Sequence, residues 1–221
     1  MPRIQGIAPL YYEFTKYLGL PEVRDRVAPL QLVGRMEDYL VKEFARYILR
    51  ASDGRRFVES NSGRRGEQKV DLVVLRAAAD GGEILEALVE AKYFRNRHRR
   101  SSHCTDAMDE IRGSLRSLQS QLRLRPVTVH GTHPVKLRAR RFRVYGLVFA
   151  SYARLSSEPN RKPDFFARVL REAQEFGLRY HDLPKPYFRH AYEDIPVDAL
   201  GARWLVTLRV GLWRGVDERA A

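Results

Sequence analysis

The sequence is poor in several features that define whole classes of protein. Its 221 residues include one cysteine, Cys104, which excludes an internal disulfide framework. No apolar stretch is long enough to cross a bilayer, and residues 1–14 lack the apolar centre of a secretory signal. Neither a Walker-type phosphate loop nor a GxSxG motif occurs, so ATP-driven and serine-hydrolase chemistry have no support. These absences predict a cytoplasmic protein with no membrane partner.

Acidic residues are also scarce relative to basic ones, and the imbalance is uneven along the chain. The sequence carries 40 Lys and Arg against 27 Asp and Glu, a net charge of +13. Residues 93–143 alone hold thirteen Lys and Arg and three Asp and Glu, a net charge of +10. Scattered charge would aid solubility equally well, whereas charge concentrated in one segment favours a polyanionic partner such as nucleic acid.

Hydrophobic periodicity predicts an α/β chain with one main domain. The expected helices cover residues 30–50, 105–124 and 164–176, and the expected strands cover residues 56–60, 69–75, 84–94, 142–152, 178–183 and 203–213. The three strands after the first helix predict an antiparallel meander. We therefore expect an N-terminal extension over residues 1–28, a core over 29–183, and a C-terminal extension with an added strand over 184–221.

Two of these apolar strands carry charges that ordinary core strands lack. Asp71 is the only acid in its strand, and Glu90 and Lys92 share one face of the next strand because side chains alternate. If the strands pair through the turn at residues 80–82, the two carboxylates lie side by side and favour a divalent cation. A neighbouring lysine can hold a water molecule or stabilise a phosphate charge. Half-exposed strands with alternating charges give the same pattern, but both strands here are too apolar for typical solvent-facing edges.

Taken with the element order, Asp71 and the EAK sequence at residues 90–92 resemble the PD-(D/E)xK nuclease superfamily, which includes restriction endonucleases and Holliday-junction resolvases. The resemblance covers about residues 30–183. It implies a restriction-endonuclease-like αβββαβ core, in which a mixed central sheet is flanked by helices. Val70 stands where many members have proline.

The resemblance also implies roles for individual residues. Asp71, Glu90 and the backbone carbonyl of Ala91 would bind Mg²⁺ (or Mn²⁺), and Lys92 would position or activate the attacking water. A glutamate of the first helix would complete the site. Glu37 and Glu43 are both candidates, and Glu37 is favoured because it lies on the expected helical stripe of Val33, Leu40 and Phe44.

Further residues are candidates for contact with nucleic acid, although solvated turns and helix surfaces explain them equally well. They are Ser62, Arg64, Arg65, Arg95, Arg97, Arg99, Arg100 and Gln119. His98, His103 and Cys104 do not predict zinc, because three ligands at this spacing match no closed four-ligand site.

The sequence thus favours a metal-dependent DNA endonuclease acting in defence, restriction, transposition or recombination, with RNA as the less favoured substrate. The alternative is a non-catalytic nucleic-acid-binding subunit of a larger complex. An assembly protein that docks its basic loop onto an acidic partner is a third interpretation. A protein partner that supplies targeting, and a homodimer, are compatible with the first.

Overall fold

The computed structural model describes residues 7–34, 36–62, 70–77, 83–96, 137–138, 143–175 and 188–214. The helices are α1 (Ile7–Leu18), α2 (Pro21–Val33), α3 (Glu37–Ala51) and α5 (Lys162–Glu175). The strands are β1 (Arg56–Ser62), β2 (Val70–Ala77), β3 (Glu83–Arg95), β4 (Leu137–Arg138), β5 (Arg143–Leu155), β6 (Phe188–Ala199) and β7 (Ala202–Arg214). None of these helices is both long enough and apolar enough to cross a membrane.

The strands form one mixed sheet, which has seven strands within the described ranges. Its order is β1-β2-β3-β5-β7-β6, and the short β4 pairs with β3 off this path. Strands β1 to β3 form an antiparallel meander, β5 runs parallel to β3, and β7 and β6 continue antiparallel beyond β5. The predicted mixed α/β architecture, a mixed sheet flanked by helices, is confirmed.

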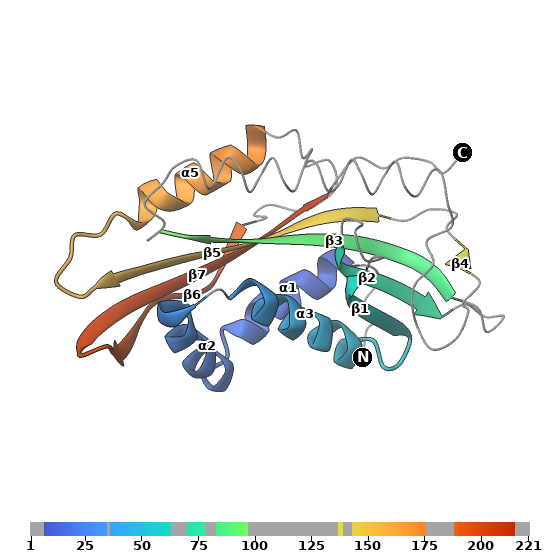
Figure 1. Cartoon of the computed structure of the whole chain (residues 1–221), viewed down its shortest axis with the longest axis horizontal. Helices are drawn as coiled ribbons and strands as arrows, with labels where there is room; N and C mark the ends of the chain where they lie inside the picture. Colours follow the sequence, from blue (N-terminus) through green and yellow to red (C-terminus); the bar gives the residue numbers. More distant parts are fainter. Residues whose placement is uncertain are drawn as a thin grey trace.

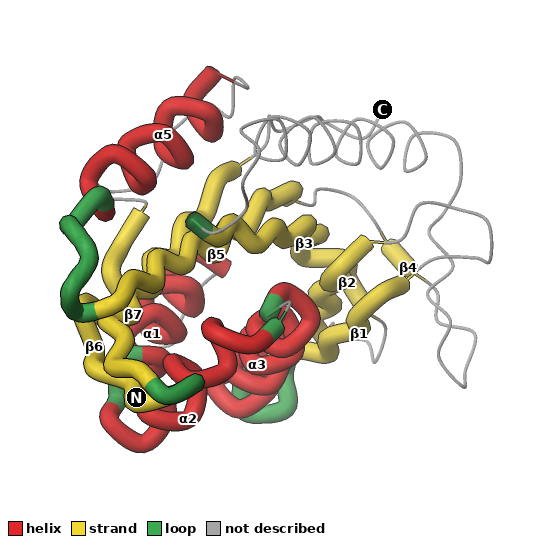
Figure 2. Tube along the Cα trace, turned by 60° about the vertical axis from the view of Figure 1, so that its left-hand side comes forward, coloured by secondary structure: helices red, strands yellow, loops and turns green. Residues whose placement is uncertain are grey.

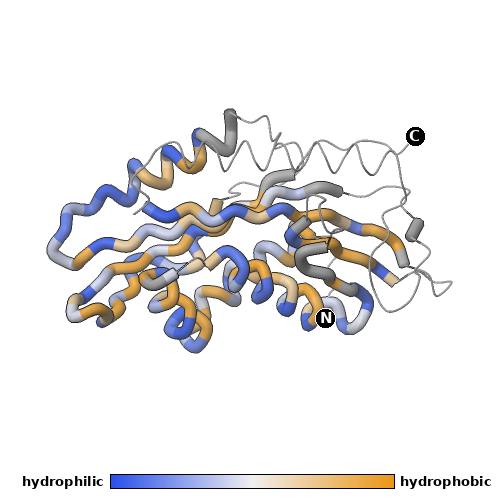
Figure 3. Tube along the Cα trace, viewed as in Figure 1, coloured by the Kyte–Doolittle hydropathy of each residue, from blue (hydrophilic) through white to orange (hydrophobic). Residues whose placement is uncertain are grey.

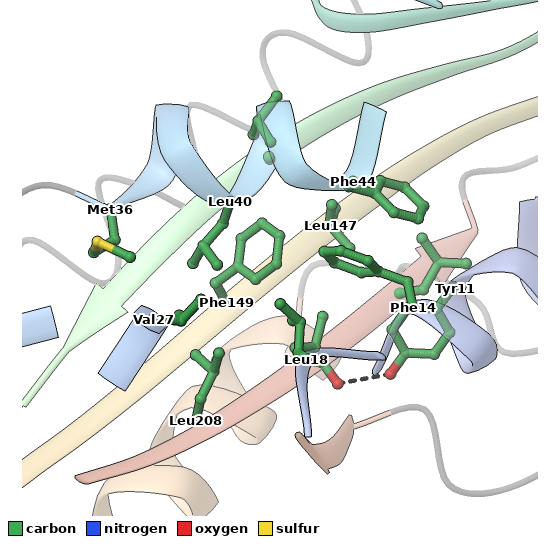
Figure 4. Close-up of a cluster of buried hydrophobic side chains, with 14 of the residues drawn as sticks. Tyr11, Phe14, Leu18, Val27, Met36, Leu40, Phe44, Leu147, Phe149 and Leu208 are labelled. Atoms are coloured by element: carbon green, nitrogen blue, oxygen red, sulfur yellow. Dashed lines mark hydrogen bonds between the residues drawn. The ribbon is translucent and has the colours of Figure 1, made fainter. Parts of the chain in front are cut away.

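Helices cover the two faces of the sheet unequally. Figures 1 and 2 show α1, α2 and α3 on one face and α5 on the opposite face. The large apolar cluster lies under the first three helices, and Figure 4 shows part of it, with Tyr11 donating a hydrogen bond of 2.6 Å to the Val210 carbonyl. The labelled members are Tyr11, Phe14, Leu18, Val27, Met36, Leu40, Phe44, Leu147, Phe149 and Leu208.

Strand alternation divides β2 and β3 between the two faces. Leu72 in β2, with Val89 and Ala91 in β3, belongs to the cluster beneath α1–α3. Their neighbours in sequence, including Asp71, Glu90 and Lys92, therefore lie on the face that also carries α5. We call this the α5 face. The buried helical core and the charged residues thus use opposite sides of the same strands.

The expected single helix over residues 30–50 is wrong, because the chain forms two helices that are separated around Gly34. Residues 1–28, expected as an N-terminal extension, contain α1 and most of α2, which pack into the core. Pro21 and Pro29 resemble turn signals in the sequence, yet Pro21 begins α2 and Pro29 lies inside it. Proline suits the first turn of a helix, so Pro21 marks a helix start rather than a loop.

The C-terminal region contains two strands rather than the one that periodicity predicts. β6 does not show a regular alternation of apolar and polar residues, because its pairing with β7 shifts register on both sides of Tyr192. The β6–β7 hairpin turns at Leu200 and Gly201, which have φ angles of 54° and 71°. The predicted strands at 142–152 and 203–213 and the helix at 164–176 correspond to β5, β7 and α5. The helix expected at 105–124 and the strand expected at 178–183 lie outside the described residues.

Candidate active site

The site begins where β2 and β3 stop pairing. Their register ends at the pair Leu72 and Val89. Beyond that pair, the Asp71 carboxylate accepts a hydrogen bond from the backbone N–H of Ala91, with Oδ2 2.7 Å from the nitrogen. A side chain of one strand thus replaces a backbone partner of the other, and this holds the Asp71 carboxylate against β3.

Glu37 fills the next position along the same edge of β3. It is the first residue of α3, and its Oε2 lies 2.7 Å from the backbone nitrogen of Tyr93, whose N–H it accepts. In a strand, the N–H and C=O of one residue point to the same lateral side, and so do those of the residue two positions on. The carbonyl of Ala91 therefore points toward the edge at which both carboxylates lie.

Glu90 and Lys92 lie on the α5 face beside this edge. The Lys92 ammonium is 3.3 Å from Oε1 of Glu90, and only 4% of Glu90 is exposed to solvent. The second oxygen, Oε2, is buried and has no hydrogen-bond partner in the described part of the chain. A buried carboxylate oxygen without a partner is energetically costly, and a bound cation would supply what is missing.

The electrostatics of the site disfavour two adjacent negative charges. Burial, and then the charge of Asp71, raise the pKa of Glu90 to about 7, while Lys92 acts in the opposite direction. Burial also raises the pKa of Glu37, against the effects of Lys92 and of the Tyr93 N–H. A divalent cation between the carboxylates would restore their charged forms, because opposite charge lowers the pKa of an acid.

The donor set fits magnesium better than a transition metal. Within residues 7–34, 36–62, 70–77, 83–96, 137–138, 143–175 and 188–214, no three His, Cys, Asp or Glu side chains form a metal-binding group. Asp71, Glu90 and the Ala91 carbonyl instead offer two carboxylates and one backbone oxygen. Mg²⁺ keeps several of its waters and is usually bound by one or two carboxylates, so this smaller set is adequate for it.

Glu43 does not lie at this site. It is buried, with a hydrogen bond from Tyr17 and ion pairs at 2.9 Å to Arg46 and 3.4 Å to Arg26. Glu37, by contrast, feels the charges of both Lys92 and Asp71. Of the two helix glutamates, the structure therefore brings only Glu37 to the β2–β3 edge.

Among the residues expected to contact nucleic acid, Arg95 has a described side chain, and that side chain lies away from this site. Arg95 is half-buried, and its guanidinium donates a 2.7 Å hydrogen bond to the carbonyl of Leu32 in α2, on the helical side of the sheet. Ser62 ends β1, but its side chain lies outside the description. The other candidates lie outside it altogether: Arg64, Arg65, Arg97, Arg99, Arg100 and Gln119, as do His98, His103 and Cys104.

One basic feature was missed by the sequence reasoning. Arg161, Arg168 and Arg171 line a pocket beside α5. Their spacings of seven and three residues place them along one face of a helix, so the signal was present in the sequence. The much larger charge excess of residues 93–143 makes it less conspicuous.

Comparison of the chain with protein-family models, curated proteins and solved structures found no match. The family resemblance of residues 30–183 therefore stays a prediction. The function has to be inferred from the residues and their geometry.

Proposed function

We propose that the chain is a metal-dependent nuclease that hydrolyses phosphodiester bonds, with DNA favoured over RNA. The observation that carries this proposal is the buried Oε2 of Glu90, which has no hydrogen-bond partner among the described residues and belongs to a carboxylate close to Asp71 and Lys92. A purely structural charge pair would satisfy both carboxylate oxygens of a buried glutamate. An oxygen left over is what a cation site requires.

The backbone supports a restriction-endonuclease-like core. α3 precedes the β1–β2–β3 meander, and β5 returns parallel to β3. A parallel return needs a crossover connection, and the long stretch of chain between Arg95 and Arg143 supplies one. These described elements follow the order that the resemblance to the PD-(D/E)xK superfamily implies, and the helix that it implies between β3 and β5 falls outside the described residues.

Each residue of the site has a distinct task. Asp71, Glu90 and the Ala91 carbonyl would hold Mg²⁺ or Mn²⁺, which supplies positive charge to the attacked phosphate and to its water. Lys92 presents an ammonium on the same face, where it can hold the attacking water and stabilise negative charge on the phosphate. Glu37 fixes the β3 edge through the Tyr93 N–H and adds negative charge near Lys92 and Asp71.

The test is a cleavage panel with the full-length chain. Linear duplex, supercoiled, branched and single-stranded DNA, and RNA, are incubated with Mg²⁺, with Mn²⁺ or with EDTA. We expect metal-dependent cleavage by the wild type and a loss of at least about 100-fold in Lys92→Ala and Asp71→Ala. Lys42→Ala removes an exposed lysine of α3 and should cleave like the wild type. Undiminished cleavage by Lys92→Ala, or cleavage in EDTA, would refute the assignment.

The net charge of +13 also favours a second candidate, a nucleic-acid-binding subunit without catalytic activity. The same panel separates the two functions. A binding subunit would retain nucleic acid in all variants and cut none of the substrates with either metal. An assembly protein that contacts an acidic protein partner would keep that partner after nuclease treatment.

A further inference from the structure

A basic pocket lies on the α5 face of the sheet, which is also the face of Glu90 and Lys92. It has a volume of about 590 Å³ and lies between the start of α5, Tyr152 of β5 and Asn96 at the end of β3. Figures 1 and 2 show α5 above that part of the sheet. Figure 3 shows a strongly hydrophilic segment leading from β5 into α5. None of the pocket residues has a role in the proposed chemistry.

Three arginines form one wall of the pocket. This wall consists of Arg161, which immediately precedes α5, and of Arg168 and Arg171 within α5. Among the described residues that line the pocket, one is acidic, Asp164. The excess is two positive charges. Arg168 lies over the ring of Phe165, with its guanidinium carbon 5.9 Å from the ring centroid. A guanidinium at this distance from an aromatic face is held by a cation–π contact.

The remaining walls are rigid. The Asn96 side chain exchanges two hydrogen bonds of 3.0 Å with the backbone of Ala153, which fixes the end of β3 to β5. The Tyr152 hydroxyl accepts the backbone N–H of Arg161 at 2.9 Å and so ties the approach to α5 onto the sheet. Tyr152 and Phe165 are almost fully buried, so their rings make an apolar floor rather than a stacking surface.

The pocket and the candidate active site are joined by one strand. Lys92 and Asn96 are four residues apart, on the same face of β3 and its continuation. At about 3.3 Å per residue, they are separated by about 13 Å. The phosphates of one strand of a duplex advance by about 3.4 Å per nucleotide along the axis, so a duplex whose axis runs along β3 would cover this distance in about four nucleotides.

These observations point to a phosphate ligand. Guanidinium groups pair with phosphate oxygens through two parallel hydrogen bonds, and an apolar floor strengthens such charged contacts. We propose that this pocket binds the phosphodiester backbone of a nucleic-acid strand about four nucleotides from the bond that is cut. The proposal that the pocket binds phosphate depends on the geometry of the pocket alone. The distance from the pocket to the bond that is cut rests on the proposed nuclease function.

The experiment compares two charge-matched double variants. Arg168→Gln with Arg171→Gln removes two arginines of the pocket, and Arg50→Gln with Arg55→Gln removes two exposed arginines at the end of α3. Binding of a fluorescent 20-nucleotide duplex and of the matching single strand is measured in EDTA over a series of salt concentrations. Cleavage is measured separately in Mg²⁺.

We expect the pocket variant to bind at least tenfold more weakly and its slope of log affinity against log salt to fall by about two. The control pair should bind within twofold of the wild type, with an unchanged slope. Arg171 is exposed, so Arg171→Gln alone tests the pocket should the double variant fail to fold, and it should lower the slope by about one. Equal slopes in the pocket and control variants, or a wild type that binds no nucleic acid, would overturn the proposal.

Two further measurements separate the alternatives. Inorganic phosphate and a mononucleotide are added as competitors, and if either binds as tightly as the strand with the same dependence on Arg171, the ligand is a free phosphate compound and the strand proposal fails. A wild type that shows arginine-dependent binding without cleavage supports the pocket and refutes the nuclease. A wild type that cuts nucleic acid, together with a pocket variant that binds as tightly as the wild type, supports the nuclease and refutes the pocket.

Discussion

In the metal-free protein, the stability of Glu90→Gln relative to the wild type should rise as the pH increases, although the substitution removes a partner of Lys92. The ionised form of Glu90 is buried beside Asp71, and its pKa is raised from 4.5 to about 7. The native state therefore binds a proton more tightly than the unfolded state does. By linkage, this group makes the wild type lose stability as the pH rises from about 4.5 to about 7, and the loss is complete above that range.

The size of the effect follows from the pKa. A rise from 4.5 to about 7 corresponds to about 3 kcal/mol, at about 1.4 kcal/mol for each pH unit. The opposing effect of Lys92 is already included in this pKa, because the ion pair forms only when Glu90 is ionised. The stability difference between Glu90→Gln and the wild type should therefore grow by up to about 3 kcal/mol, in favour of the variant, between pH 5 and pH 8.5.

The assay is urea denaturation of both proteins in EDTA at these two pH values, followed by circular dichroism. Glu43→Gln is the control, because Glu43 is equally buried but forms ion pairs with Arg46 and Arg26. It should lower stability at both pH values. Adding Mg²⁺ at pH 8.5 should stabilise the wild type and leave Glu90→Gln unchanged. If the difference between Glu90→Gln and the wild type does not change with pH, the buried charge inferred for Glu90 is wrong.

Two other substitutions test separate parts of the structure. Glu37→Gln should reduce cleavage at least tenfold with little loss of stability, because Glu37 is the one of the two glutamates that reaches β3. Glu43→Gln should lower the free energy of unfolding by about 1–3 kcal/mol and leave cleavage intact. The reverse outcome in paired cleavage and urea assays would exchange their roles. Gly19→Ala should destabilise the protein by about 1–3 kcal/mol, because a Cβ at this position would lie 2.6 Å from the backbone oxygen of Ala191. A thermal melt that matches the wild type would show that α1 and β6 are less closely packed there.

The position of the charged residues could be predicted from the sequence because strands impose a period of two. Asp71 is the only acid of an apolar strand, and Glu90 and Lys92 share a face whatever the details of the turn. The hairpin pairing then brings them together. What the sequence could not supply is the end of the pairing at Leu72, where a carboxylate takes the place of a backbone acceptor.

Glu37 was favoured for a reason that the structure does not bear out. The expected stripe ran through Val33, which belongs to α2 and not to the helix of Glu37. Glu37 reaches β3 because it begins α3, and a helix start cannot be located from hydrophobic spacing when another helix ends four residues earlier. Arg95 shows the same limit, because no pattern in the sequence indicates that its guanidinium binds the carbonyl of Leu32.

The N-terminal helices were missed although part of the signal was present. Ile7, Leu10, Phe14 and Leu18 recur at helical spacing in α1 and are buried. Gly19, Pro21 and Pro29 are residues typical of turns, and their presence made the helical spacing harder to recognise. β6 is different, because register shifts on both sides of Tyr192 remove the alternation from which a strand is recognised.

The division of β3 between two faces makes its length matter as much as its residues. Val89 and Ala91 face the helical core, and Glu90 and Lys92 face the other way. Deleting or inserting a single residue before them would exchange the two sets, so that an acid and an ammonium would press against α1–α3 while their apolar neighbours turned outward. Replacements at these positions alter chemistry one side chain at a time, but a change of one in the residue count would remove the site and the core together.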